Sequence, residues 1–250
     1  MTTQSQKAQD FAALHVSGNP LVLYNIWDAG SAMAVAKAGA AAVATGSWSV
    51  AGAQGYGDGE QIPLSLLVQI ATRISQSVDV PLSVDFEGGY AAGGAELTAN
   101  VAQVIGAGAV GINFEDQIVG GAGLYSIEEQ SQRLRAVRSA GADLFINART
   151  DLFLKERDSS RHGGLLDEAV QRSQAFAAAG ASGFFVPGLS DLDLIAQVCE
   201  ASPLPVNVMM RGDTMTRQAV AKAGVARASY GPQPFVDAMQ AVTDRFQALG

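Results

Sequence analysis

The sequence has few of the residues that build disulfides or soft-metal centres. Its 250 residues include one cysteine and two histidines, and only 16% of the residues are charged. A single thiol excludes a disulfide within the chain. Cys199 lies in the helical pattern "LIAQVCEASPLP", which favours a buried inert thiol over a nucleophile. We therefore expect neither a disulfide nor cysteine chemistry.

Positive charge and long apolar runs are scarce as well. The 16 Lys and Arg residues are outnumbered by 24 Asp and Glu residues, which gives a net charge of −8. This balance argues against nucleic-acid or anionic-membrane binding, because both need a basic surface. No apolar run reaches the roughly 18 residues of a membrane span, and the opening "MTTQSQKAQDFAAL" lacks the build of a signal peptide. We expect a cytoplasmic protein with a small-molecule partner.

A helix-to-strand phrase recurs along the chain. It occurs as "AKAGAAAV", "IGAGAVGI", "RSAGADLF", "AAAGASGFF" and "AKAGVARA", each a helix end, a capping glycine and an apolar strand start. Proline marks the remaining strand entries, in "GNP", "DVPLSVDF" and "SPLPVNVM". The predicted strands are 21–27, 41–46, 81–86, 111–115, 144–149, 183–187, 205–209 and 227–230. Eight such units predict one α/β domain over 1–250, a closed (β/α)₈ TIM-type barrel, with a doubly wound open sheet as the alternative.

Acidic residues gather where strands three and four end. Asp85 and Glu87 lie in "SVDFEGGY", and Glu115 ends the next strand. Functional groups of such barrels sit at the carboxyl ends of the strands, where these charges would repel one another unless a cation balanced them. Oxygen ligands favour Mg²⁺ or Mn²⁺ over Zn²⁺. The alternative, that each carboxylate caps a helix or pairs with a lysine, is favoured only for Asp28 and Asp151.

Arg149 and a polar turn supply candidate anion-binding groups. The planar guanidinium of Arg149 binds a carboxylate in two places, with a structural ion pair to Asp151 or Glu115 as the alternative. Thr45, Gly46 and Ser47 offer backbone N–H groups and hydroxyls to a small anion. Trp48 is expected to line this pocket, and simple packing against its neighbours is the alternative.

Two loops and two histidines are further candidates. The glycine-rich "GAQGYGDGEQIP" is long enough to bring Asp58 over the barrel mouth, although a solvated loop is the alternative. His162 follows strand five. We interpret it as a solvated loop residue, with a role as general acid or base as the alternative. His15 is interpreted as structural. Tyr125 could bring a phenol from the loop after strand four.

Ordered motifs resemble those of the phosphoenolpyruvate mutase and isocitrate lyase superfamily. They are "NIWDAGSA", "GYGDGE", "PLSVDFEGGY", "GINFEDQ", "INARTD", "FFVPGL", "PVNVM" and "ASYGP", between residues 21 and 231. The resemblance implies an α/β barrel in homodimers or homotetramers that exchange a C-terminal helix. It implies Mg²⁺, with Mn²⁺ as the alternative ion, held by Asp85 and, partly through waters, by Asp58, Glu87 and Glu115.

The resemblance also implies a substrate class. Small α-keto or α-hydroxy carboxylates would meet the Thr45–Ser47 turn and Arg149, with Asn207 lining the pocket, and cleavage would leave a metal-chelated enolate. Arg149 and Asp58 are the predicted catalytic residues.

The sequence departs from the superfamily in the loop after strand four. This loop, "DQIVGGAGLYSIEEQ", lacks the lysine-cysteine stretch of the lyases and the lysine and asparagine of the mutases. Glu87 stands where many members have aspartate. We therefore predict C–C cleavage of an oxaloacetate-like or methylisocitrate-like acid by a lyase, decarboxylase or hydrolase. A phosphonate-related mutase reaction and a silent metabolite-binding barrel are the alternatives. Segments 52–62 and 117–125 are expected to be the most mobile without ligand.

Overall fold

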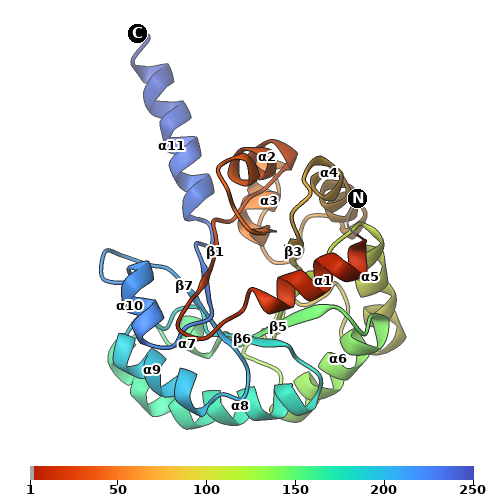
Figure 1. Ribbon diagram of the computed structural model, residues 1–250, viewed down its shortest axis with the longest axis vertical. Coiled ribbons are helices and arrows are strands. Elements are labelled where there is room, and N and C mark those ends of the chain that lie inside the picture. The colour runs from red at the N-terminus through yellow and green to blue at the C-terminus, as the bar shows by residue number, and fades with distance from the viewer. Residues whose placement is uncertain (1–2) are drawn as a thin grey trace.

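The computed structural model describes residues 3–250 and forms a parallel barrel surrounded by helices (Figure 1). Its strands are β1 (Leu21–Leu23), β2 (Val43–Ala44), β3 (Leu82–Asp85), β4 (Gly111–Glu115), β5 (Phe145–Arg149), β6 (Gly183–Phe185), β7 (Val206–Met209) and β8 (Arg227–Ser229). The sheet runs β1-β8-β7-β6-β5-β4-β3-β2, and a parallel bridge between Ile26 and Thr45 joins its two edges. The predicted (β/α)₈ barrel is confirmed.

Helices cover the outside of the barrel. They are α1 (Gln4–Ala13), α2 (Ala29–Lys37), α3 (Ser47–Ala53), α4 (Leu64–Ser77), α5 (Gly94–Gly106), α6 (Ile127–Ala140), α7 (Leu152–Lys155), the 3₁₀ helix η1 (Ser159–Leu165), α8 (Leu166–Ala178), α9 (Leu192–Ala201), α10 (Arg217–Lys222) and α11 (Gln233–Gln247). Four of the five recurring phrases place their glycine at positive φ directly after a helix: Gly39, Gly108, Gly180 and Gly224. Gly141 instead caps α6 in extended backbone, with φ −166°.

The strands alternate between an apolar outer face and a polar inner face. Ile112, Phe114 and Ile146 are buried among the outward-facing side chains, whereas the inward-facing positions of the neighbouring strands are polar. The buried inner residues are Ser83, Asn113, Asn147, Asn207, Arg227 and Ser229. Hydrogen bonds join several of these polar side chains, among them Asn113, Asn147 and Arg227. Other inward-facing residues, Leu21, Leu23 and Phe145, form a separate apolar cluster with Phe11.

Helix α1 crosses one end of the barrel in Figure 1. Its Phe11 is fully buried, and a Cβ added to Gly111 would lie 2.7 Å from the Phe11 ring. His15 stacks on Phe145 with ring centroids 4.0 Å apart, and its Nδ1 lies 2.8 Å from the carbonyl oxygen of Phe11. Burial lowers the pKa of His15 to about 3. The structural interpretation of His15 is confirmed.

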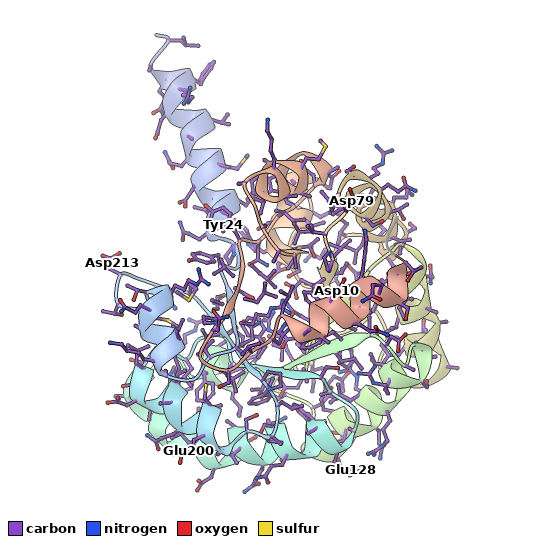
Figure 2. All side chains as sticks on the ribbon, in the orientation of Figure 1. Asp10, Tyr24, Asp79, Glu128, Glu200 and Asp213 are labelled. Carbon is purple, nitrogen blue, oxygen red and sulfur yellow. The ribbon has the colours of Figure 1, made fainter. Side chains whose placement is uncertain are left out.

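Helix α11 projects away from the barrel, and the chain ends at its tip (Figure 1). Several of its apolar side chains are solvent-exposed, among them Val242 at 62% and Phe246 at 76%. Figure 2 shows acidic side chains on the helical layer, including the labelled Asp10, Glu128 and Glu200, which are exposed. None of the helices within residues 3–250 is long and apolar enough to cross a membrane.

Candidate active site

A cavity of about 180 Å³ opens at the carboxyl ends of the strands. It is smaller than the pockets of 300–1,000 Å³ that hold drug-sized ligands. Its lining includes six of the predicted site residues: Gly46, Ser47, Trp48, Asp58, Asp85 and Arg149. Asn25, Asn113, Phe185, Met209 and Ser229 complete much of the wall and were not predicted. The size and polarity of this cavity suit a small acid.

Asp85 ends β3 and is held from three sides. Its Oδ2 accepts the Ser47 N–H at 3.0 Å, and its Oδ1 accepts an N–H from the Asn113 amide at 3.2 Å. Its backbone N–H donates to the Thr45 hydroxyl at 2.8 Å. The carboxylate is therefore fixed at the cavity wall. Each of its oxygens retains acceptor capacity, because a carboxylate accepts about four hydrogen bonds.

Glu87 connects the mouth to the glycine-rich loop. Its Oε1 accepts the Gly59 N–H at 3.0 Å, and its Oε2 accepts the Glu60 N–H at 2.9 Å. The Glu60 carboxylate in turn accepts the Tyr90 N–H at 2.8 Å. Glu60, Glu87 and Tyr90 all have positive φ, at 58°, 49° and 58°, which is uncommon for residues other than glycine. This reciprocal pair of contacts, called here the Glu60–Glu87 clasp, holds Asp58 beside the cavity.

Arg149 ends β5 and faces two carboxylates. Its Nη1 lies 3.0 Å from Glu115 Oε2, and its Nε and Nη2 donate to the two oxygens of Asp151 at 2.5 and 3.0 Å. The structural ion pair predicted as the alternative is therefore present, with both acids at once. Asp151 accepts from two of the five guanidinium N–H groups, so others are left for Glu115 and a ligand. Burial alone lowers the pKa of Arg149, but Glu115 and Asp151 outweigh it and raise that pKa well above its ordinary value.

The acidic groups at the mouth raise one another's pKa values. Burial, followed by Asp85, Asp58 and Glu115, raises the pKa of Glu87 to about 9. Burial also raises the pKa of Glu115 to about 8, although Arg149 opposes the shift. A divalent cation would remove this conflict, since it favours the ionised carboxylates.

The spacing of these groups bears on how an ion would bind. Among residues 3–250, no three His, Cys, Asp or Glu side chains converge closely enough to hold one ion directly. This arrangement fits an ion with one direct carboxylate ligand and several waters. Mg²⁺ is commonly bound in that way, because it gives up its waters reluctantly.

Some predicted residues lie outside the cavity lining. Thr45 is buried and supports the Asp85 backbone. Asn207 is buried in the barrel interior, where its Oδ1 accepts from Ser229 Oγ at 3.2 Å. The Tyr125 ring lies over the Arg133 guanidinium, 4.1 Å from centroid to Cζ, and lines a separate cavity. The interpretation of His162 as a solvated residue was wrong: it is buried against Phe153 and contacts the Glu156 carbonyl oxygen at 2.9 Å.

The capping interpretation holds for one aspartate and fails for the other. Asp28 caps α2, where its Oδ1 accepts the Ser31 N–H at 2.7 Å. Asp151 precedes α7 but makes no capping hydrogen bond with its side chain, because that carboxylate pairs with Arg149.

Cys199 is partly buried on α9, and burial raises the pKa of its thiol to about 12, as expected for an inert cysteine.

Asn25, Asn113 and Ser229 are the site residues that the sequence analysis missed. Asn25 Oδ1 accepts the N–H groups of Tyr230 and Gly231, both at 2.9 Å, which closes the wall between β1 and β8. Asn113 stands two positions before Glu115, so it points to the same face of β4. The alternation of apolar and polar residues along "GINFE" could therefore have identified Asn113 as a site residue from the sequence.

Comparisons with known proteins find related sequences and structures. A model of the phosphoenolpyruvate phosphomutase family matches residues 11–249. The 2-methylisocitrate lyase of Escherichia coli K12 is 31% identical over 239 residues, which cover 88% of this chain and 76% of that enzyme. The oxaloacetate decarboxylase of Paraburkholderia xenovorans LB400 is 28% identical over 196 residues, covering 75% of this chain and 63% of the enzyme. A crystal structure from Burkholderia cenocepacia J2315, provisionally described as a phosphonomutase, has a TM-score of 0.96 and 44% identity, over 99% of this chain and 100% of that one.

Proposed function

Because the chain belongs to the phosphoenolpyruvate phosphomutase family, as its motifs predicted, we propose that it is an enzyme that cleaves a C–C bond of a small α-keto or α-hydroxy carboxylate. The observation that carries this proposal is the cavity itself, whose lining combines the carboxylates of Asp85 and Asp58 with Arg149. Carboxylates and a guanidinium around one small cavity suit a chelating acid, one end of which binds a metal ion and the other an arginine.

The donor set supports a divalent cation at Asp85. Asp85 would hold it directly, and Asp58, Glu87 and Glu115 would hold it through waters. Mg²⁺ is the proposed ion and Mn²⁺ the alternative, since the candidate ligands are all oxygens. When bound, such a cation supplies Lewis-acid stabilisation of an oxygen that gains negative charge.

The residues of the chain orient the acid and limit the access of water. The N–H groups of Arg149 that Asp151 does not take would bind the substrate carboxylate, and Ser47 lines the same cavity. Trp48 lines the cavity with 45% of its surface exposed, and Asp58 reaches the cavity from the loop held by Glu87. Excluding water protects a charged product from random protonation.

The loop at 117–125 narrows the choice of reaction. It holds no Lys, Cys or His that could act as an acid or base. Decarboxylation of an oxaloacetate-like acid needs no such group, because the bonding electrons pass to the enolate as CO₂ leaves. We therefore favour decarboxylation of an oxaloacetate-like acid, with hydrolysis next, since hydrolysis would also need a group that activates water. A phosphonate mutase reaction is the second candidate, favoured by the 44% identity to the structure from B. cenocepacia.

A substrate panel tests the proposed function. Purified protein is incubated with oxaloacetate, 2-methylisocitrate or phosphonopyruvate, in Mg²⁺ or in EDTA, and NMR follows the products against the uncatalysed rate. Decarboxylation of oxaloacetate or cleavage of 2-methylisocitrate gives pyruvate, hydrolysis of oxaloacetate gives oxalate and acetate, and a mutase reaction converts phosphonopyruvate to phosphoenolpyruvate. We expect turnover of a keto acid that EDTA and Asp85→Asn both abolish, with His162→Gln as a control outside the cavity. Turnover of phosphonopyruvate alone would favour the mutase-type reaction. No turnover, together with tight binding of oxalate, would favour a silent binding barrel.

We further propose that the chain forms a homodimer or homotetramer through α11. The exposed apolar residues of this projecting helix support the proposal, because monomers rarely expose such surfaces. Light scattering after size exclusion should report an oligomer that Phe246→Glu weakens and Thr243→Glu leaves intact. A monomeric wild-type protein at micromolar concentration would contradict it.

A cytoplasmic location and a single functional domain over 1–250 also stay proposals, which cell fractionation and limited proteolysis would test.

A further inference from the structure

The largest fully buried side chain in the described structure is the charged Arg227 of β8. Strand β8 lies opposite β4 in the barrel, and the Arg227 side chain crosses the interior between them. Its Nη2 donates to Asn113 Oδ1 at 3.1 Å, and its Nε donates to Ser229 Oγ at 3.3 Å. Its Nη1 has no partner, and no ion pair to it is found among residues 3–250.

Filling space does not explain an arginine at this place. A buried guanidinium without a carboxylate partner is expensive, whereas an apolar side chain of similar size would fill the barrel without that cost. The pKa of Arg227 is lowered to about 9 by burial, so the group still carries its charge at neutral pH. Packing alone therefore does not explain why a charged side chain is buried here.

Asn113 links Arg227 to the active site. Its Oδ1 accepts two hydrogen bonds, from Arg227 Nη2 and from Asn147 Nδ2 at 2.8 Å. Two donors on one oxygen fix the orientation of the amide, so the Nδ2 group must point the other way. That Nδ2 donates to Asp85 Oδ1 at 3.2 Å. A charged donor at one end of the amide also polarises it and strengthens the bond at its other end.

We propose that Arg227 is a positioning residue, which acts through Asn113 to orient the Asp85 carboxylate for the divalent cation. This inference rests on the proposed function, because it assumes a cation at Asp85. The other hydrogen bond of Asp85, from the Ser47 N–H to Oδ2, fixes only one of its oxygens. The bond from Asn113 fixes the second, so the carboxylate plane depends on both.

The possible roles of Arg227 predict different changes in cation affinity when this residue is replaced. If Arg227 only fills the barrel, its loss lowers stability and leaves cation affinity unchanged. If its positive charge mainly repels the cation, its loss tightens binding. If it orients Asp85, its loss weakens binding even in a folded protein.

Mn²⁺ binding without substrate separates these roles. The free-ion signal in electron paramagnetic resonance gives a Kd for wild type, Arg227→Met and the control Arg138→Met. Arg138 serves as the control because its guanidinium, like that of Arg227, donates to uncharged oxygens, here the carbonyl oxygens of Gly180 and Leu144, but on the outside of the barrel. We expect at least a tenfold higher Kd for Arg227→Met and a change below twofold for Arg138→Met. An unchanged or lower Kd for a folded Arg227→Met would overturn the inference.

Two further measurements keep the inference testable. Arg227→Lys keeps the charge and offers a single donor, so it should give an intermediate Kd if the methionine variant does not fold; a wild-type Kd would overturn the inference. Combining Arg227→Met with Asn113→Ala should weaken binding no further than Asn113→Ala alone, because both act on one contact. Fully additive losses would also overturn it. A wild-type protein that binds no Mn²⁺ would overturn the proposed function itself, whereas equal Kd values for wild type and variants would overturn only the role of Arg227.

Discussion

Replacing Arg149 by lysine should separate geometry from charge at the active site. The guanidinium donates two hydrogen bonds to Asp151 and forms an ion pair with Glu115, from a side chain that is 16% exposed. A lysine ammonium keeps the positive charge but cannot present a planar fork to Asp151 while reaching Glu115. We expect it to keep one of the two acids as a partner and to leave the other partly unpaired.

The size of the effect follows from the lost contacts. Hydrogen bonds to charged groups contribute about 1.5–3 kcal/mol, and removing one partner of a buried pair costs about 3–5 kcal/mol. Because the charge is retained, we expect Arg149→Lys to lower the free energy of unfolding by about 3 kcal/mol. For a chain of this length each kcal/mol shifts the melting temperature by about 2–4 °C, so the drop should be about 6–12 °C.

Arg149→Lys should also lower kcat/KM, independently of its effect on stability. Losing a bidentate contact to the substrate carboxylate should cost about 2.7 kcal/mol, which is about a 100-fold drop in kcat/KM. The loss should fall on KM and kcat together, since Arg149 holds the substrate and also orients Glu115. Steady-state kinetics well below the melting temperature measure this drop. Unchanged kinetics in a destabilised variant would show that Arg149 only pairs with Glu115 and Asp151.

Two other predictions concern the acidic mouth and its loop. The folded pKa values of Glu87 and Glu115, about 9 and 8, lie above their ordinary value of 4.5, so the stability they contribute is complete below pH 4.5 and is lost as the pH rises through 8–9. The melting temperature in EDTA should therefore fall from pH 6 to pH 9, and Mg²⁺ should remove most of that fall; a flat profile in EDTA would contradict the prediction. Glu60→Ala should speed hydrogen exchange at residues 55–61 by at least tenfold, whereas Glu60→Gln, which keeps an acceptor for the Tyr90 N–H, should stay within threefold of wild type. Equal exchange in both variants would show that the Glu60–Glu87 clasp does not hold this loop.

The barrel was predictable because its signals are local. Each recurring phrase joins a helix end, a capping glycine and an apolar strand, and the eight observed strands lie within the predicted ranges. The structure shortens β2 to Val43–Ala44 because only those residues meet β3 in register, at Leu82 and Ser83. Strand ends depend on partners distant in the sequence, which a local pattern does not contain.

The site was predictable where charge broke an apolar pattern. Asp85, Glu87, Glu115 and Arg149 stand out at strand ends. In the structure Asp85 and Arg149 line the cavity, Glu115 pairs with Arg149, and Glu87 lies near Asp85 and Asp58. Arg227 did not stand out, because "AKAGVARA" is typical of a strand entry and an arginine there suggests solvent. Its contact with Asn113 spans 114 positions of the sequence, so only the closed barrel reveals it.

Glu87 shows how a small departure from the superfamily pattern changes the site. The sequence indicated only that glutamate is a methylene longer than the aspartate of many members, with an expected effect on the distance to the ion. In the structure, that length carries its two oxygens to the N–H groups of Gly59 and Glu60. An aspartate at this position would end about 1.5 Å short, roughly the length of one C–C bond. The extra methylene therefore joins Glu87, a proposed water-mediated ligand of the ion, to the loop that carries Asp58, so that the same carboxylate would serve the ion and holds the loop.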